Sequence, residues 1–172
     1  MIFRRTIFAT AIRSISKQKG VERTIMPEKE TLERAAEDKA KGKSASTQAG
    51  EFVREEIEHI REGKHGARSA KQAIAIGLSK ARRAGVNLAA PKKGKASEET
   101  REQAARDLRK GKSPGKKKSA KRSRAMLKKL KRESHSAASK TALSRQAHSA
   151  AAKRSAASRS RSAKKAAKTR KK

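Results

Sequence analysis

Acidic residues almost disappear from the last third of this 172-residue chain, and that separation of charge limits what the chain can fold into. Residues 111–172 hold 23 Lys and Arg but a single acid, Glu133, whereas residues 26–110 hold 20 basic and 14 acidic residues. Two thirds of the formal charge of +33 therefore lie after Lys110. Repulsion on this scale opposes compaction and attracts polyanions through a field that salt screens. The pattern predicts a mixed-charge domain followed by a basic tail.

Large apolar side chains are scarce. The chain has three Phe and no Trp or Tyr, and many of its apolar residues, 33% of the total, are alanines. At roughly 25 cal/mol per Å² of buried apolar surface, alanine-rich helices do not offset the entropy of ordering so long a chain. We therefore expect a mostly α fold: a small helical hairpin with flanking marginal helices and a long, largely disordered basic tail. The absence of Cys excludes disulfides and thiolate metal sites, and no apolar stretch reaches the roughly 18–20 residues of a membrane span.

The first 25 residues form an N-terminal extension that is basic and lacks an acid before Glu22. This composition is typical of an organelle transit peptide, but Arg4 falls among the apolar residues on a helical wheel and weakens the amphipathic stripe. The alternative is that translation starts at Met26 and that residues 1–25 are a mis-assigned upstream stretch. Both interpretations remain open from the sequence.

Helical signals begin at Met26. Residues 26–45 predict a marginal helix with only Leu32 as a large apolar anchor. Residues 46–90 predict the hairpin: Ser46 or Thr47 caps a first helix that Gly63 ends, and Ser69 caps a second that Gly85 ends. Each helix carries an apolar stripe at helical spacing. The stripe residues are Phe52, Val53, Ile57 and Ile60 in the first helix, and Ala70, Ala73, Ile74, Gly77, Leu78 and Ala81 in the second.

Two further segments follow the hairpin. Residues 91–112 predict a linker and a short helix that Ser97 caps and that only Leu108 and a few alanines could dock. Residues 113–172 are a low-complexity tail of Lys, Arg, Ser and Ala, with one short helix predicted around Ala125–Leu130.

The tail supplies most candidate contacts to nucleic acid. Each contact of a cation with a phosphate releases condensed counterions, so affinity grows with the number of contacts and falls with salt. The candidates in the tail are Lys116, Lys117, Lys118, Lys121, Arg122, Arg124, Lys128, Lys129, Lys131, Arg132, Lys153, Arg154, Lys164 and Lys165.

The hairpin could contribute base recognition if it is a helix-turn-helix whose second helix presents Lys80, Arg82 and Arg83 to a major groove. The favoured alternative is a plain two-helix interaction module, because the third helix that such a motif needs is weak here. The lack of Tyr and Trp excludes aromatic stacking platforms for single strands.

Catalytic and metal-binding patterns are not evident in the sequence. His59 follows Glu56 at the Glu-x-x-His spacing of di-iron bundles, but no second copy exists, and its neighbour Ile60 on the stripe predicts an exposed position for His59. His65 lies in a Gly-flanked turn, and His135 and His148 lie in the tail. We therefore expect no enzyme activity, no cofactor, no metal and no small-molecule substrate.

The stretch GEFVREEIEHIREGKHGARSAKQAIAIGLSKARRAGV, residues 50–86, resembles a small bacterial domain of uncharacterised function found in short basic proteins. Its most specific part is GKHGARSAKQAIAIGLSKAR. The tail is similar in composition to the Lys/Ala/Ser-rich ends of bacterial histone-like proteins. The resemblance implies association with DNA or the nucleoid in a bacterial cytoplasm, and it brings no catalytic residues.

Together these features predict histone-like, sequence-nonspecific binding of DNA through the phosphate contacts of the tail. Two alternatives remain open. One is a protein-interaction module that the tail tethers to nucleic acid, with a protein partner or a second copy bound by the hairpin. The other is association with RNA or the ribosome, which charge alone does not separate from DNA.

Overall fold

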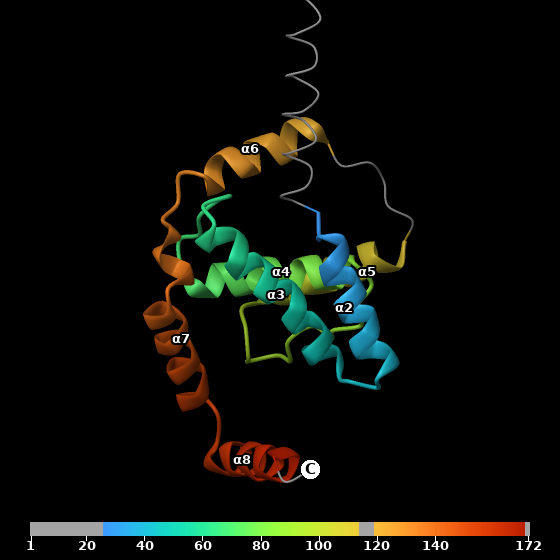
Figure 1. The fold of residues 1–172 in the computed structure, drawn as a ribbon, viewed down its shortest axis with the longest axis vertical. Helices are drawn as coiled ribbons and strands as arrows, with labels where there is room; N and C mark the ends of the chain where they lie inside the picture. The colour runs from blue at the N-terminus through green and yellow to red at the C-terminus, as the bar shows by residue number, and fades with distance from the viewer. Residues whose placement is uncertain (1–25, 114–118, 171–172) are drawn as a thin grey trace, which may run out of the picture.

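The computed structural model describes residues 26–113 and 119–170, and this part of the chain is mostly helical, which confirms the predicted class. It holds seven α-helices and one short 3₁₀-helix, with no strand among the described residues. Figure 1 shows α3 and α4 crossing at the centre of the molecule. In chain order the helices are α2 Lys29–Ala40, α3 Ala45–Arg61, α4 Ala70–Arg83, α5 Glu98–Lys112, α6 Ala120–Leu130, η1 His135–Ala138, α7 Lys140–Ala152 and α8 Ala156–Arg170.

Helices α3 and α4 form the predicted hairpin. Ser69 caps α4 as expected, because its hydroxyl accepts a hydrogen bond from the backbone N–H of Gln72. The cap of α3 is Ser44, and not Ser46 or Thr47: the helix begins one turn earlier than the apolar stripe indicates. The helices pack closely at Gly77, where a Cβ atom would lie 2.6 Å from the Cα of Val53. Only glycine allows this close approach of two backbones.

The apolar core has two parts, one near the turn of the hairpin and one near its open end. The first is centred on Ile57 and Ile60, and the second on Phe52, which is 1% exposed. Alanine fills most other core positions, so the buried area per residue is small. The other buried members are Ala67, Ala73, Ala137 and Ala138 in the first part, and Ala35, Ala49, Ala81 and Val86 in the second.

Helices α2 and α5 flank the hairpin, α2 on α3 and α5 on α4. Leu32, the expected anchor of α2, is 41% exposed, and α2 docks instead through its short side chains Thr31, Ala35 and Asp38. In α5 the buried residues are Ala104 and Asp107 rather than Leu108. The flanking helices are therefore held by small and polar side chains.

Part of the predicted tail belongs to the core. The backbone N–H groups of Gly66 and Ala67 donate to the carbonyls of Leu130 and Ser134, at 2.9 and 3.0 Å. Gly66 lies so close to this segment that a Cβ would be 1.9 Å from the Glu133 carbonyl oxygen. Beyond it, η1 contacts α3 and α4, and Ala138 is completely buried. The boundary that composition places at residue 113 thus does not mark the end of the packed structure.

The described part of the tail is helical, where composition predicts that it is largely disordered. Alanine spacers favour helix, and Ser119 and Ser139 cap α6 and α7 with their hydroxyl groups. The short helix expected near Ala125–Leu130 is the end of α6. Helices α7 and α8 have no buried residue, and α8 lies apart from the helical core (Figure 1).

The predictions for residues 1–25 and for Lys116, Lys117 and Lys118 concern positions outside the described residues. None of the described helices combines the length and apolarity that crossing a bilayer requires.

Candidate functional site

Five ionisable side chains are buried together where α3, α4 and the turn between them meet. Glu55, Glu56 and His59 come from α3, Lys80 comes from α4 and His65 from the turn, and each is at most 4% exposed. Helix geometry explains the contribution of α3, since residues one and four positions apart can turn toward the same neighbouring helix. We call these residues the buried ionic cluster.

Lys80 lies between the two carboxylates of the buried ionic cluster. Its Nζ atom is 2.8 Å from Oε2 of Glu56 and 3.3 Å from Oε1 of Glu55. A buried charge persists only when it is paired, because its hydration is lost. The side chain of Lys80 therefore neutralises one of two adjacent negative charges, and the other needs a further cation.

Both histidines of the cluster have one ring nitrogen engaged by an acceptor. The Nε2 atom of His59 is 2.8 Å from Oε1 of Glu28, and Nδ1 of His65 is 3.2 Å from the carbonyl oxygen of Gly66. The hydrogen bond from His59, followed by that from Lys64, lowers the pKa of the Glu28 carboxyl group, which therefore accepts. These bonds assign a proton to Nε2 of His59 and to Nδ1 of His65.

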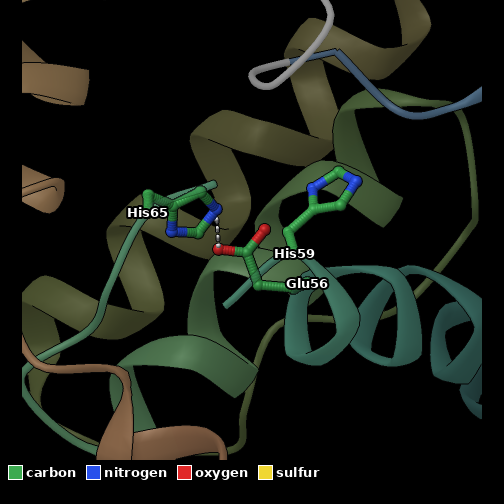
Figure 2. Close-up of side chains that lie close together, drawn as sticks. All are labelled: Glu56, His59 and His65. Carbon is green, nitrogen blue, oxygen red and sulfur yellow. Dashed lines mark ion pairs between the residues drawn. The ribbon is translucent and has the colours of Figure 1, made fainter. Parts of the chain in front are cut away.

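Figure 2 shows His65 turned toward the Glu56 carboxylate, with the ring of His59 beside them. Nδ1 of His59 lies 3.9 Å from Oε1 of Glu55. The Nε2 atom of His65 is 3.4 Å from Oε1 of Glu56. One donor atom each from Glu56, His59 and His65 lies within 4.8 Å of the other two. Oε2 of Glu56 has its ion pair with Lys80, whereas Oε1 of Glu56 and Nδ1 of His59 are buried without a hydrogen-bond partner. Such atoms are rare and need an explanation.

This arrangement corrects the prediction for the histidines. His59 was expected to be exposed, but its side chain is only 2% exposed. Helix α2 and the residues just before it, including Glu28, cover that face of α3. His65 and His59 are six residues apart, and the turn after α3 folds back so that their ring centres are 6.2 Å apart. Spacing along the sequence did not indicate this proximity.

The prediction for the second hairpin helix is also corrected. Lys80 and Arg82 are 4% and 8% exposed, so neither is presented to a groove. The guanidinium of Arg82 instead donates to the carbonyl of Leu88, and burial lowers its pKa. Arg83 is only partly exposed, and its Nε atom donates to the carbonyl of Ser79. Lys80 and Arg82 are therefore not available to contact bases, although Lys71 on the same helix is exposed.

The candidate contacts in the described tail, in contrast, are all exposed. They are spread over α6, the link between α7 and α8, and α8. No Lys or Arg within residues 119–170 forms an ion pair with a described acidic side chain. These exposed candidates are Lys121, Arg122, Arg124, Lys128, Lys129, Lys131, Arg132, Lys153, Arg154, Lys164 and Lys165.

Many cations of the helical domain, but not all, are paired. Arg34, Lys43, Lys64 and Arg101, for example, are each paired with a carboxylate of residues 26–113. The structure thus separates cations that stabilise the domain from cations whose charge is directed only at solvent.

Comparisons with protein families, with curated proteins and with solved structures gave no match to this chain.

Proposed function

We propose that this protein binds duplex nucleic acid, and DNA first of all, without sequence specificity, through the exposed cations of residues 119–170. The observation that carries the proposal is the absence of carboxylate partners for these cations among the described residues, while their side chains are exposed. An unpaired surface cation binds a phosphate without first breaking an internal ion pair.

The distribution of the charge favours contacts with the backbone over contacts with bases. In α8 the basic residues Arg159, Arg161, Lys164, Lys165 and Lys168 point to several sides of the helix, since each residue turns it by about 100°. A helix that reads one groove needs its contacts on one face. Cations on several sides fit the phosphates of a wrapped duplex, or of two neighbouring duplexes, and give the histone-like mode of binding.

The test compares two variants with the same change in net charge. The first replaces five of the six basic residues of α8 with Gln and keeps Arg170, which leaves the core intact because α8 has no buried residue. The control replaces five exposed lysines of the domain that have no described ion pair, Lys39, Lys71, Lys92, Lys93 and Lys95, with Gln. Deleting everything after Lys110 is unsuitable, because it would remove Ala137 and Ala138 from the core.

Binding to a duplex DNA is measured at several salt concentrations. Each lost phosphate contact lowers the slope of log K against log salt by about 0.9, so the α8 variant loses up to about 4 units of slope. The control keeps most of its slope. Equal losses in both variants would contradict the assignment to the tail.

Competition between duplex DNA and duplex RNA of the same length, at matched salt, tests the preference for DNA. The proposal expects DNA to displace RNA, since the wider spacing of B-form grooves suits wrapping by separate short helices. Tighter binding of RNA would overturn the DNA assignment while leaving the role of the tail in place.

A further inference from the structure

We propose that Glu56, His59 and His65 bind one divalent transition-metal ion, and that Zn²⁺ is the ion that fits best. This inference is independent of nucleic-acid binding, because it concerns the inside of the domain and not the exposed tail. Two imidazoles and a carboxylate are a donor set that suits zinc. The argument rests on the orientation of the donors, on their missing partners, on their spacing and on charge.

The histidines are oriented as metal ligands. A ligating histidine donates the N–H of its second nitrogen to a carboxylate or a backbone carbonyl, which fixes the tautomer. His59 does so to Glu28 and His65 to the carbonyl of Gly66. The nitrogen left to bind a metal ion is then Nδ1 in His59 and Nε2 in His65, and the latter lies 3.4 Å from Oε1 of Glu56.

The donor atoms lack other partners. Nδ1 of His59 and Oε1 of Glu56 are buried and accept no hydrogen bond. Lys80 is engaged at the second oxygen of Glu56, 2.8 Å from Oε2, and therefore leaves Oε1 for another cation. Ligating carboxylates commonly have such an outer partner. A buried lone pair with no donor is destabilising, and a metal ion would remove this cost.

The spacing is close to that of a coordination sphere. Bonds of about 2.0–2.1 Å in a tetrahedron place ligand atoms about 3.3 Å apart. Oε1 of Glu56 and Nε2 of His65 are already 3.4 Å apart. The His59 donor is within 4.8 Å of both, so it has to move by up to about 1.5 Å to reach the spacing of a tetrahedral site. Three protein ligands leave the fourth position of the tetrahedron for a water molecule.

Charge also favours a cation. Glu55 and Glu56 are two carboxyl groups that share a single ammonium group, that of Lys80. With neutral imidazoles the buried ionic cluster keeps one excess negative charge, which costs free energy in a medium of low dielectric constant. A divalent ion reverses the excess to one positive charge, and the carboxylate of Glu28, hydrogen-bonded to His59, balances it.

Such an ion would join three parts of the chain. It would tie α3 to the turn that holds His65, and this turn is hydrogen-bonded through Gly66 and Ala67 to residues 130–134. The site would therefore be a structural one that stabilises the hairpin and the docking of the tail segment, since a ligand that binds only the folded state raises its stability.

The test uses the full chain, freed of metal with a chelator, and titrates it with Zn²⁺ by isothermal calorimetry. The expected result is one ion per chain with a Kd at or below about 1 µM, together with a higher Tm in Zn²⁺. His65→Gln and His59→Gln should each weaken binding at least about tenfold. The matched control is His148→Gln, because His148 is exposed on α7, and it should bind as the unmodified chain does.

Two variants guard against a loss of fold. His65→Cys supplies a thiolate, which zinc also accepts, and should restore at least part of the affinity that His65→Gln loses. Glu28→Gln changes a side chain that is 47% exposed, so the fold should persist, and binding should weaken about 10–100-fold through the loss of the partner of His59.

The competing explanation is a proton in place of the metal, with His65 held as an imidazolium by Glu56. If the unmodified chain binds no Zn²⁺ at micromolar concentrations, or binds it equally well after His59→Gln and His65→Gln, the proposal is wrong. Detection by NMR of protons on both nitrogens of His65 in the presence of excess Zn²⁺ would overturn it as well.

Discussion

Replacing Lys80 with Met tests whether the buried ionic cluster holds the hairpin together. Met is close to Lys in length and keeps the packing, but it removes the cation that lies 2.8 Å from Glu56 and 3.3 Å from Glu55. The two carboxylates are 0% and 2% exposed and have no other buried lysine or arginine among their described contacts. Removing one partner of a buried ion pair costs about 3–5 kcal/mol, because an uncompensated charge remains.

The free energy of unfolding is measured by urea titration, followed by far-UV circular dichroism, with a chelator present so that no metal ion replaces the lost charge. The control is Lys71→Met. Lys71 is exposed near the start of the same helix, so this substitution should change the free energy of unfolding by no more than about 0.5 kcal/mol. Adding Glu56→Gln to Lys80→Met should recover part of the loss, since one buried charge is then removed.

A loss below about 1 kcal/mol for Lys80→Met would refute this reasoning, because it would mean that Glu55 and Glu56 are neutral in the folded protein or reach water. A loss that Glu56→Gln does not reduce would show that the cost comes from packing and not from charge. Either result would also weaken the argument from charge for a metal ion.

Two further substitutions test the packing of the hairpin by the same urea titration. Gly77→Ala places a methyl group 2.6 Å from the Cα of Val53, so it should destabilise the fold by about 1–3 kcal/mol; an unchanged midpoint would show that α3 and α4 can separate at no cost. Asp107→Ala removes the acceptor of the 2.6 Å hydrogen bond from Ser79, the contact that docks α5 on α4, and should cost about 1–3 kcal/mol. The control is Glu102→Ala, because Glu102 is exposed on the same helix. If Asp107→Ala lowered the free energy of unfolding by less than Glu102→Ala, this role for Asp107 would be contradicted.

Local signals in the sequence predicted the framework of this fold. The cap residues Ser69 and Ser97 and the glycines after α3 and α4 each act through neighbours a few positions away, so the sequence displays them directly. The stripe of Phe52, Ile57 and Ile60 is buried as its spacing predicts. Exposure of the tail cations likewise follows from the near-absence of acids.

The buried ionic cluster was missed because its pairing depends on contacts between helices. One signal was present: Glu56 is four residues from both Phe52 and Ile60, so it falls within the apolar stripe of α3. Lys80 adjoins the stripe of α4 in the same way, between Gly77 and Ala81. An acidic residue within one apolar stripe and a basic residue beside another indicate a buried ion pair if the two helices pack face to face. The sequence alone does not show that they do.

The docking of η1 was missed for a different reason. Residues 134–138 are two serines, two alanines and His135, without Lys or Arg, and the overall composition of the basic, low-complexity segment around them hides this difference. Alanine buries little area, so its role depends on whether a matching surface exists elsewhere. That surface is formed by Ile57, Ile60 and Ala67, which are distant in sequence.

This distant contact has a consequence for synthesis on the ribosome. Arg61, at the end of α3, donates to the carbonyl of Ala138, and the two residues are 77 positions apart. At about 5–20 residues per second, α3 waits about 4–15 s after the synthesis of Arg61 before the segment that completes one half of the core is made. During that interval Ile57 and Ile60 are uncovered, and the chain already carries the cations of α6. The domain can therefore finish folding only when the part of the chain that attracts polyanions has been synthesised, which places the nascent protein beside ribosomal RNA while its core is still open.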